Sequence, residues 1–484
     1  MPIRRRHLAV TVLAIVAACL PAFAGGKPKQ QSQPAGNAAQ QLAALCEKLG
    51  ENRSVAVVAR NLSDGKLWIA HNPDTPLKPA SVMKLFATAA AIHRLGPTFQ
   101  YETRVYLNHD ELIIIGSGDP AIGDDRVEER NGKPRFWQLD AWARSVKQQL
   151  GDRPLARLVL DDSIFDSQVR HSEWPDDQYL EWYQAPVGGL NLNDNCLDAR
   201  ARVADGQVLV TPLPTLPSEF IINRLKSGKA TKASIQRAAD SDVFEFVGTV
   251  AGATEFGSGS VNRPTTFFGH AMREALARNG VVLDGPVVRR TIDSRSLAEK
   301  TPLAVHHTPL RDVVWRANNF SQNLFAECLF KSLSAYQPGG ARANSPGSFD
   351  ASARVIRQTL EQMGVPTEGA TFADGSGLGH GNRVSAAQIV RLLEVMRRHP
   401  GAADFVESLA VPGRDGTLRR RWTDAKFAAA LRAKTGTIRG VSTLAGYVDR
   451  PDGTVIAFAI VLNGPAPETL MQNVVRTLIE APLP

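Results

Sequence analysis

The chain has 484 residues, of which 43% are hydrophobic and 21% are charged, and its net charge at pH 7 is +8. The length predicts more than one domain, and the composition excludes a fully disordered chain, a collagen-like fibre and a polytopic membrane protein. Four cysteines are too few for a disulfide-built scaffold, and the sequence contains neither a CxxC pair nor an HExxH motif. We therefore expect no metal site and no cofactor.

Lysine and arginine residues are scattered along the chain, with the run 419–421 as an exception. Scattered basic residues are typical of a solvated surface, whereas a nucleic-acid-binding face concentrates them. We therefore expect no nucleic-acid partner.

Residues 1–24 have the pattern of a secretory signal peptide, with a basic start, an apolar stretch at 8–18 and a small-x-small cleavage site at 22–24. The apolar stretch is too short to span a bilayer. Residues 16–19 also resemble a bacterial lipobox, in which Cys19 would be lipidated and would attach the chain peripherally to a membrane. Both alternatives predict export to the periplasm or cell envelope, and removal of the peptide lowers the net charge from +8 to +5.

Residues 25–40 are rich in Gly, Pro, Gln and Lys, and this composition predicts a flexible leader ahead of the folded part. The exported chain keeps Cys46, Cys196 and Cys328. An odd number of thiols allows at most one intramolecular disulfide, and free buried thiols are the simpler alternative.

The folded part is predicted to begin with a β-hairpin over 54–60 and 67–70, joined by the turn residues Asp64-Gly65. An Ala-rich run with apolar residues at helical spacing then predicts a helix over 82–95, which ends at a Gly-Pro pair. Ser81 stands at the entrance of this helix, so we expect it in the first turn.

The middle of the chain, residues 97–300, contains short β-like runs separated by Gly, Pro and Asp, at 112–115, 158–160 and 208–210. We interpret it as a large β-rich insertion of one or two domains. Residues 335–348, rich in Gly, Pro, Ser and Asn, predict a loop within the helical part that follows.

Near the C-terminus, three strands and a final helix are predicted at 431–437, 443–448, 455–462 and 467–479. The early hairpin and this late meander are most simply joined in one antiparallel sheet that helices cover. The predicted fold class is therefore α+β, with a discontinuous domain formed by residues 41–96 and 301–484.

Three short motifs carry the chemistry, in the order Ser81-Val82-Met83-Lys84, Ser321-Gln322-Asn323 and Lys434-Thr435-Gly436. Each alone is a weak signal. Their placement at one helix start, at the opening of another helix and on a late strand is far more restrictive. Together they predict a site built around a nucleophilic serine.

Residues i and i+3 in a first helical turn share a face, so Lys84 Nζ can approach Ser81 Oγ. A lysine can take the serine proton only if its pKa is lowered, which we expect from burial and from the charge of Lys434. The backbone N–H groups of Ser81 and Thr437 would form an oxyanion hole.

Ser321 and Asn323 lie two residues apart at a helix entrance, where both side chains can face one cleft. We expect Ser321 to relay a proton to a leaving amine and Asn323 to bind a substrate amide. Lys434 would attract a substrate carboxylate.

These motifs resemble those of the penicillin-recognising serine enzymes. The chain is most similar to the low-molecular-mass class C penicillin-binding proteins, the serine D-alanyl-D-alanine carboxypeptidases and endopeptidases, because a gap of 237 positions separates Lys84 from Ser321. Gln322 stands where the general pattern has Asp, and we expect its side chain to point away from the cleft. Further segments that resemble the family are 118–120, 161–165, 193–196 and 374–378.

The resemblance implies a penicillin-recognising serine transpeptidase-like domain. It assigns one role to each of five residues. Ser81 is the acylated nucleophile, Lys84 the general base and Ser321 the proton relay. Asn323 is the contact of the substrate amide, and Lys434 is the electrostatic anchor.

The substrate's terminal carboxylate is expected beside Thr435, Gly436 and Thr437. Family members can carry an acid from the insertion at the cleft, and two residues of this chain, Asp177 and Glu181, compete for that place. The preference for a substrate side chain therefore stays open at this point.

The implied function is that of an exported serine DD-peptidase. It would remove terminal D-Ala from peptidoglycan stem peptides, cleave D-Ala cross-links between them, or both, and β-lactams would inhibit it by acylating the same serine. The alternatives are a β-lactamase, which differs in how fast the acyl-enzyme is hydrolysed, and a penicillin-binding sensor or scaffold that does not turn over. The long insertion disfavours the first, and the complete lysine motifs disfavour the second.

Overall fold

The computed structural model describes residues 37–47, 54–297, 299–464 and 468–483. The predicted signal peptide, Cys19 and most of the predicted leader lie outside the described residues. The last residues of that leader start a helix, α1 (Ala38–Glu47). Ala38, Leu42 and Cys46 recur every four residues, and this buried stripe packs against the C-terminal helix α12 (Glu468–Glu480).

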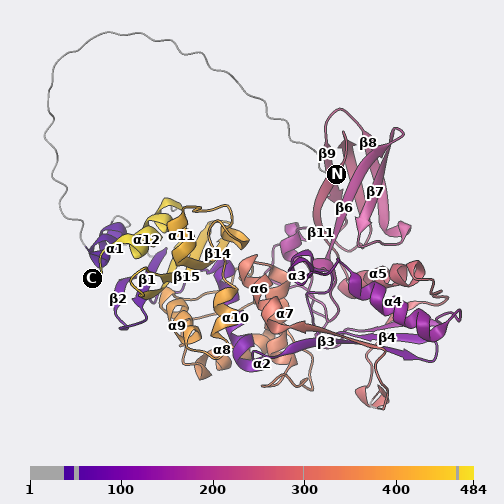
Figure 1. Cartoon of the computed structure of the whole chain (residues 1–484), viewed down its shortest axis with the longest axis horizontal. Helices are drawn as coiled ribbons and strands as arrows, with labels where there is room; N and C mark the ends of the chain where they lie inside the picture. Colours follow the sequence, from indigo (N-terminus) through magenta and orange to yellow (C-terminus); the bar gives the residue numbers. More distant parts are fainter. Residues whose placement is uncertain (1–36, 48–53, 298, 465–467, 484) are drawn as a thin grey trace, which may run out of the picture. The chain divides into compact units, whose positions relative to one another are not determined.

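One antiparallel sheet joins the two ends of the chain (Figure 1). Its strand order is β14 (Leu431–Ile438), β15 (Val441–Asp449), β16 (Val455–Asn463), β1 (Val55–Asn61) and β2 (Leu67–His71). Val57 pairs with Ile460 in the register that brings the hairpin against the meander. The predicted shared sheet is therefore confirmed.

Helices cover both faces of this sheet. Because successive side chains of a strand point to opposite faces, Val57 packs with α1, α11 (Ala425–Ala430) and α12, whereas Val58 packs with α2 (Met83–Leu95) and α9 (Ala386–Arg397). The central strand β16 is buried along almost its whole length. The sheet is therefore a rigid base for residues on its edge strand β14.

A layer of helices surrounds α2. It consists of α6 (Leu310–Asn319), α7 (Asn323–Ala335), α8 (Phe349–Gln362) and α9, and α10 (Ala402–Glu407) packs against α6 and α9. Nearly all residues of α2 and α7 are buried, since α2 contacts α6, α7, α8 and α9. Residues 336–348 form the predicted loop between α7 and α8.

The insertion contains a five-stranded sheet of mixed direction. Its strand order is β12 (Val287–Arg289), β5 (Arg157–Asp161), β4 (Glu111–Ile115), β3 (Gln100–Asn108) and β13 (Ala304–Pro309). The pairs β12–β5 and β5–β4 are parallel, and the other two pairs are antiparallel. The strand β13 belongs to this sheet although it follows residue 300, the predicted end of the insertion.

Parallel strands need a long crossover between them, and helices supply it here. The insertion thus holds α3 (Asp125–Arg130), α4 (Trp137–Leu150) and α5 (Pro264–Arg278) in addition to its strands. Leu139, Trp142 and Val146 form a stripe at helical spacing on α4 that is buried in the core of the insertion.

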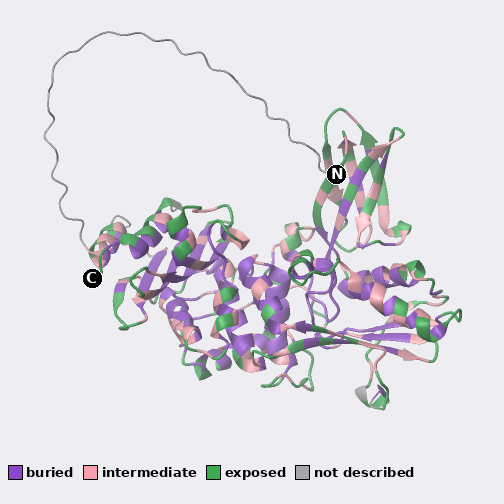
Figure 2. Ribbon diagram, viewed as in Figure 1, coloured by how far each residue is buried: buried purple, intermediate pink, exposed green. Residues whose placement is uncertain are grey.

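Two three-stranded sheets complete the insertion, with the orders β8 (Ile221–Ser227), β10 (Phe244–Val250), β9 (Lys232–Gln236) and β11 (Thr254–Ser260), β6 (Cys196–Ala204), β7 (Gln207–Leu213). Figure 2 shows many exposed residues on these strands, in contrast to the buried strands of the sheet that joins the chain ends. The predicted β-rich character of the insertion is confirmed.

Cys46, Cys196 and Cys328 are buried and free, so the described cysteines form no disulfide with one another. No described helix is both long and apolar enough to cross a bilayer.

Candidate active site

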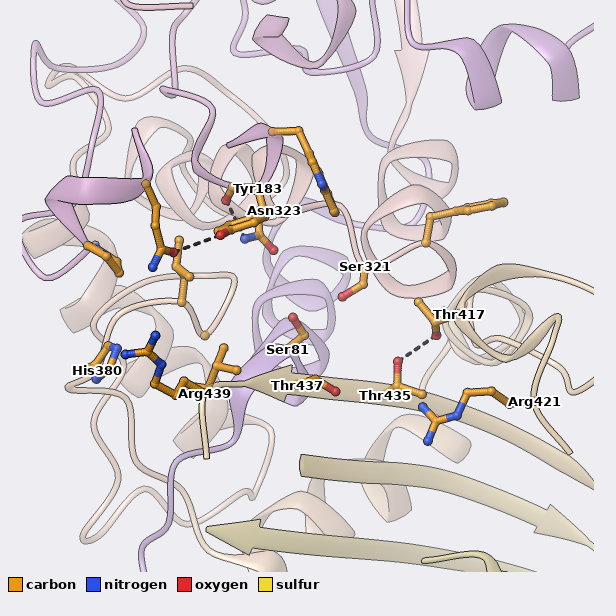
Figure 3. A pocket seen from close by; sticks show the side chains of 17 residues that line it. Ser81, Tyr183, Ser321, Asn323, His380, Thr417, Arg421, Thr435, Thr437 and Arg439 are labelled. Atoms are coloured by element: carbon orange, nitrogen blue, oxygen red, sulfur yellow. Dashed lines mark hydrogen bonds between the residues drawn. The ribbon is translucent and has the colours of Figure 1, made fainter. Parts of the chain in front are cut away.

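A cleft of about 640 Å³ lies where β14, the start of α2 and the turn between α6 and α7 meet (Figure 3). Among the predicted site residues, those that line it are Ser81, Ser321, Asn323, Thr435 and Thr437. Three further predicted residues lie directly behind this lining. Lys84 contacts Ser81, Lys434 contacts Ser321, and Gly436 packs against the backbone of Ser81. The structure therefore brings the three sequence motifs together at one cleft.

Ser81 lies in a short 3₁₀ turn, Ala80–Val82, which leads directly into α2 at Met83. It thus stands just before the α-helix and not within its first turn. Gly436 of β14 packs against this turn, because a Cβ atom at that position would lie 2.8 Å from Ser81 N. Only glycine permits so close an approach, so the Gly of the third motif lets the strand contact the nucleophile's backbone.

Lys84 is fully buried and makes three hydrogen-bonding contacts through Nζ. They are to Ser81 Oγ at 2.8 Å, Asn323 Oδ1 at 2.7 Å and the Ser376 carbonyl oxygen at 3.0 Å. The last two groups can only accept. A neutral amine has two N–H groups and one lone pair, so its lone pair is left to face the Ser81 hydroxyl.

Burial lowers the pKa of Lys84 from 10.5 to about 7, against the opposing charges of Glu327 and Asp374. At neutral pH a large fraction of Lys84 is therefore the uncharged amine that can accept a proton.

The low pKa of Lys84 comes chiefly from burial, and the same cause acts on Lys434. Lys434 is also fully buried, and burial together with the charge of Lys84 holds its own pKa well below the usual value. Its Nζ donates to Ser321 Oγ at 2.8 Å and to the Thr435 carbonyl oxygen at 2.6 Å.

Two buried acids below Lys84 were not predicted as site residues. Glu327 of α7 accepts hydrogen bonds from Gly375 N at 2.8 Å and Ser376 N at 2.9 Å, and burial raises its pKa. Asp374 accepts from Gly377 N at 2.7 Å and from Trp174 Nε1 at 2.9 Å. These bonds fix the loop whose Ser376 carbonyl contacts Lys84.

A sequence signal for both acids existed. Asp374 opens the segment 374–378, which resembles a segment of the family. Glu327 follows Asn323 by four residues on α7, so the two side chains share one face of the helix. The segment 374–378 thus borders the cleft and also supplies the carbonyl oxygen that Lys84 contacts.

Ser321 occupies the turn between α6 and α7 and has a left-handed backbone, with φ of 63°. Asn323 is the first residue of α7, and its Nδ2 donates to the Tyr183 carbonyl oxygen at 2.7 Å while Oδ1 faces Lys84. Gln322 is buried and does not line the cleft, as expected.

The cleft contains cations but no carboxylate among the described lining residues. Asp177 and Glu181 are exposed and lie outside the lining, whereas Gln178 from the same segment borders the cleft. Neither candidate acid therefore contacts the cleft.

In Figure 3, His380 and Arg439 lie at one end of the cleft and Arg421 lies at the other, with Ser81 between them. At the Arg421 end, Thr435 Oγ1 donates to Thr417 Oγ1 at 2.8 Å. The two ends of the cleft are thus basic, and the nucleophile lies at its middle.

A family model described as D-Ala-D-Ala carboxypeptidase 3 (S13) matches residues 38–481. The chain is 29% identical over 462 residues to a D-alanyl-D-alanine carboxypeptidase of Actinomadura sp., a match that covers 88% of this chain and 81% of that protein. It is 24% identical over 439 residues to the D-alanyl-D-alanine carboxypeptidase DacB of Haemophilus influenzae, which covers 87% of each chain.

The crystal structure of penicillin binding protein 4 (dacB) from Haemophilus influenzae superposes with a TM-score of 0.71 at 23% identity. The superposition covers 90% of this chain and 98% of that chain. The two proteins therefore share a fold, and the predicted fold class is confirmed.

Proposed function

The chain belongs to the D-Ala-D-Ala carboxypeptidase 3 (S13) family, and we propose that this serine DD-peptidase acts on peptidoglycan stem peptides through an acyl-enzyme on Ser81. The observation that carries the proposal is the hydrogen bonding of Lys84, whose only partner able to donate is the Ser81 hydroxyl. A nucleophile and a base matched in this way are what acyl transfer requires.

In the first step, Ser81 Oγ attacks the carbonyl carbon of the penultimate D-Ala and its proton passes to Lys84 Nζ, 2.8 Å away. The carbonyl oxygen becomes an oxyanion, for which we assign the backbone N–H groups of Ser81 and Thr437 as donors. The close packing of Gly436 on Ser81 N supports this assignment, because it brings β14 to the nucleophile.

In the second step, the proton that Lys84 took from Ser81 passes to the leaving amine, which leaves Lys84 neutral again. We assign Ser321 as the relay for this transfer, because its hydroxyl lines the cleft and is bonded to Lys434 Nζ at 2.8 Å. A nearby carboxylate raises an amine's pKa, so the terminal carboxylate of the substrate would favour the ammonium form of Lys434, which we assign as its anchor. Water then attacks the ester carbonyl while neutral Lys84 takes a proton from it, and Lys84 gives that proton to Ser81 Oγ as the acyl group leaves.

The basic ends of the cleft suit an acidic peptide. Thr435 and Thr437 would border the terminal carboxylate, with Arg421 at the same end as Thr435, and Arg439 would face the acyl part of the stem peptide. Cleavage of a D-Ala cross-link is the same reaction with a longer leaving amine. A β-lactam presents a strained amide to the same serine, so we expect it to acylate Ser81.

Peptidoglycan lies outside the cytoplasmic membrane, so this substrate requires export to the periplasm or cell envelope. We assign that task to residues 1–24, which have the pattern of a signal peptide and lie outside the described residues. Lipidation of Cys19 would additionally attach the enzyme to the membrane surface.

The test is to assay D-Ala released from a muropeptide pentapeptide by the exported chain, while a fluorescent penicillin reports formation and loss of the acyl-enzyme. The proposal predicts D-Ala release and slow loss of label, both absent in Ser81→Ala. Rapid loss of label without D-Ala would make the protein a β-lactamase, and stable label without D-Ala would make it a sensor.

A further inference from the structure

The turn that carries Ser321 and Asn323 is under backbone strain. Ser321 has a φ of 63°, in the left-handed region that is unfavourable for residues other than glycine. Such a conformation persists only where neighbouring groups hold it in place. The contacts of this turn therefore decide where both side chains point.

Gln322, the residue between them, is only 3% exposed and provides the main contact. Its Oε1 accepts a hydrogen bond from Asn323 N at 2.9 Å, and its Nε2 donates to Asp194 Oδ2 at 2.7 Å. One side-chain amide thus joins the first N–H of α7 to a carboxylate of the insertion.

A fixed turn of the insertion presents Asp194. Residues 193–195 all have a positive φ, from 50° to 57°. Asn195 holds this turn, because its Nδ2 donates to the Pro186 carbonyl oxygen at 2.7 Å and to Asn191 Oδ1 at 2.6 Å. The insertion therefore holds the backbone of Asp194 in place.

Arg316 of α6 forms a second link between Asp194 and the strained turn. Its Nη2 donates to Asp194 Oδ2 at 3.0 Å, and its Nε donates to Asp124 Oδ2 at 2.7 Å. Arg316 lies five residues before Ser321 and Gln322 directly after it, so Asp194 Oδ2 receives a hydrogen bond from each side of Ser321.

We propose that Asp194 is a positioning residue that fixes Ser321 and Asn323 through Gln322, so that the insertion holds the second motif in its reactive geometry. The inference rests on the roles proposed above for Ser321 and Asn323. Asp194 does not line the catalytic cleft, so its effect on the reaction passes through the turn.

The test exchanges the amide of Gln322 and the carboxylate of Asp194, and it measures the rate of acylation by a fluorescent penicillin. Gln322→Glu replaces the N–H donor to Asp194 Oδ2 with a second acid, and we expect the saturating acylation rate to fall about tenfold to a hundredfold. The preceding non-covalent dissociation constant should change little, since neither Gln322 nor Asp194 lines the cleft. The double variant Asp194→Asn/Gln322→Glu restores an amide–carboxylate pair with donor and acceptor exchanged. It should recover part of the lost rate and not all of it, because Arg316 Nη2 loses its acceptor at position 194.

A control variant separates positioning from general destabilisation. Tyr336→Phe removes the hydrogen bond from Tyr336 Oη to the Ser117 carbonyl oxygen at 2.7 Å, a buried contact between the loop after α7 and the insertion. It should lower the Tm without slowing acylation. If Gln322→Glu does not fold, Gln322→Met removes both hydrogen bonds of the Gln322 amide without adding a charge, and a loss of rate in the same range is expected.

Wild-type acylation rates in the Gln322 variants would overturn the inference, as would a double variant that stays as slow as Gln322→Glu. A wild-type enzyme that takes no label, or a Ser81→Ala variant that does, would instead contradict the proposed function. The two failures are thus distinguishable.

Discussion

Asn323 Oδ1 lies 2.7 Å from Lys84 Nζ, although the two residues are 239 positions apart. The second motif therefore orients the base of the first motif. Since its Nδ2 donates to the Tyr183 carbonyl oxygen, both ends of the Asn323 amide have partners within the protein. The sequence predicted Asn323 as a contact of the substrate amide, and its position makes it first of all a partner of Lys84.

This contact predicts the behaviour of Asn323→Asp. A carboxylate 2.7 Å from Lys84 Nζ would favour the ammonium form and raise the pKa of Lys84. We expect acylation at neutral pH to fall at least about tenfold and the midpoint of its pH profile to move upward by about one unit or more. The measurement is the rate of penicillin labelling against pH. Asn223→Asp, which alters a hydrogen-bonded asparagine of β8, should leave that midpoint in place.

The pH dependence of the wild-type enzyme should follow Lys84. Its pKa of about 7 makes it an ammonium below that pH and a neutral amine above it. Only the neutral form accepts the Ser81 proton, so the acylation rate constant should rise through pH 7 and level off about one to two units higher. Penicillin labelling between about pH 5.5 and 9 checks this. A rate that falls with rising pH would contradict the assignment of Lys84 as the base.

Glu327→Gln tests the buried acids below the base. The charge of Glu327 raises the pKa of Lys84, so its removal should move the midpoint of the acylation profile to lower pH. The variant should also lose stability, by about 1–3 kcal/mol, because one of the Gly375 and Ser376 N–H groups would face an amide donor. Thermal unfolding and the pH profile measure the two effects separately, and an upward shift of the midpoint would be inconsistent with this account.

Gly436→Ala tests the close contact of β14 with the nucleophile. The added Cβ atom would lie 2.8 Å from Ser81 N, so the strand or the turn must move. A displacement of about 1 Å at a reacting group can cost about a hundredfold in rate, and we expect an acylation defect of that order. Gly257→Ala of β11 is the matched control, because its Cβ atom would meet nothing within 4 Å. Equal rates in the two variants would show that the contact has no catalytic consequence.

The sequence predicted the features that depend on local pattern and order. Alternating apolar residues and turn signals were enough to place the hairpin and the C-terminal meander in one sheet, and helical spacing was enough for α2. The three motifs were predicted to meet because the order of their elements restricts the fold.

Other features depend on packing between distant segments and could not be predicted in the same way. The lowered pKa of Lys434 follows from its complete burial beside Lys84, and no spacing in the sequence encodes that burial. The support of Lys84 by Glu327 and Asp374 requires the 374–378 loop to fold against α7. The helices α4 and α5 were missed because the short β-like runs around them dominated the pattern of the insertion.

The most direct test of the central claim is to incubate the protein with benzylpenicillin, digest it and locate the added mass by tandem mass spectrometry. The account predicts one adduct, on the Oγ atom of Ser81, and none in Lys84→Ala, for which removal of the base should slow acylation on the order of a thousandfold. An adduct on any other residue, or full labelling of Lys84→Ala, would contradict the assignment of this serine and lysine as nucleophile and base.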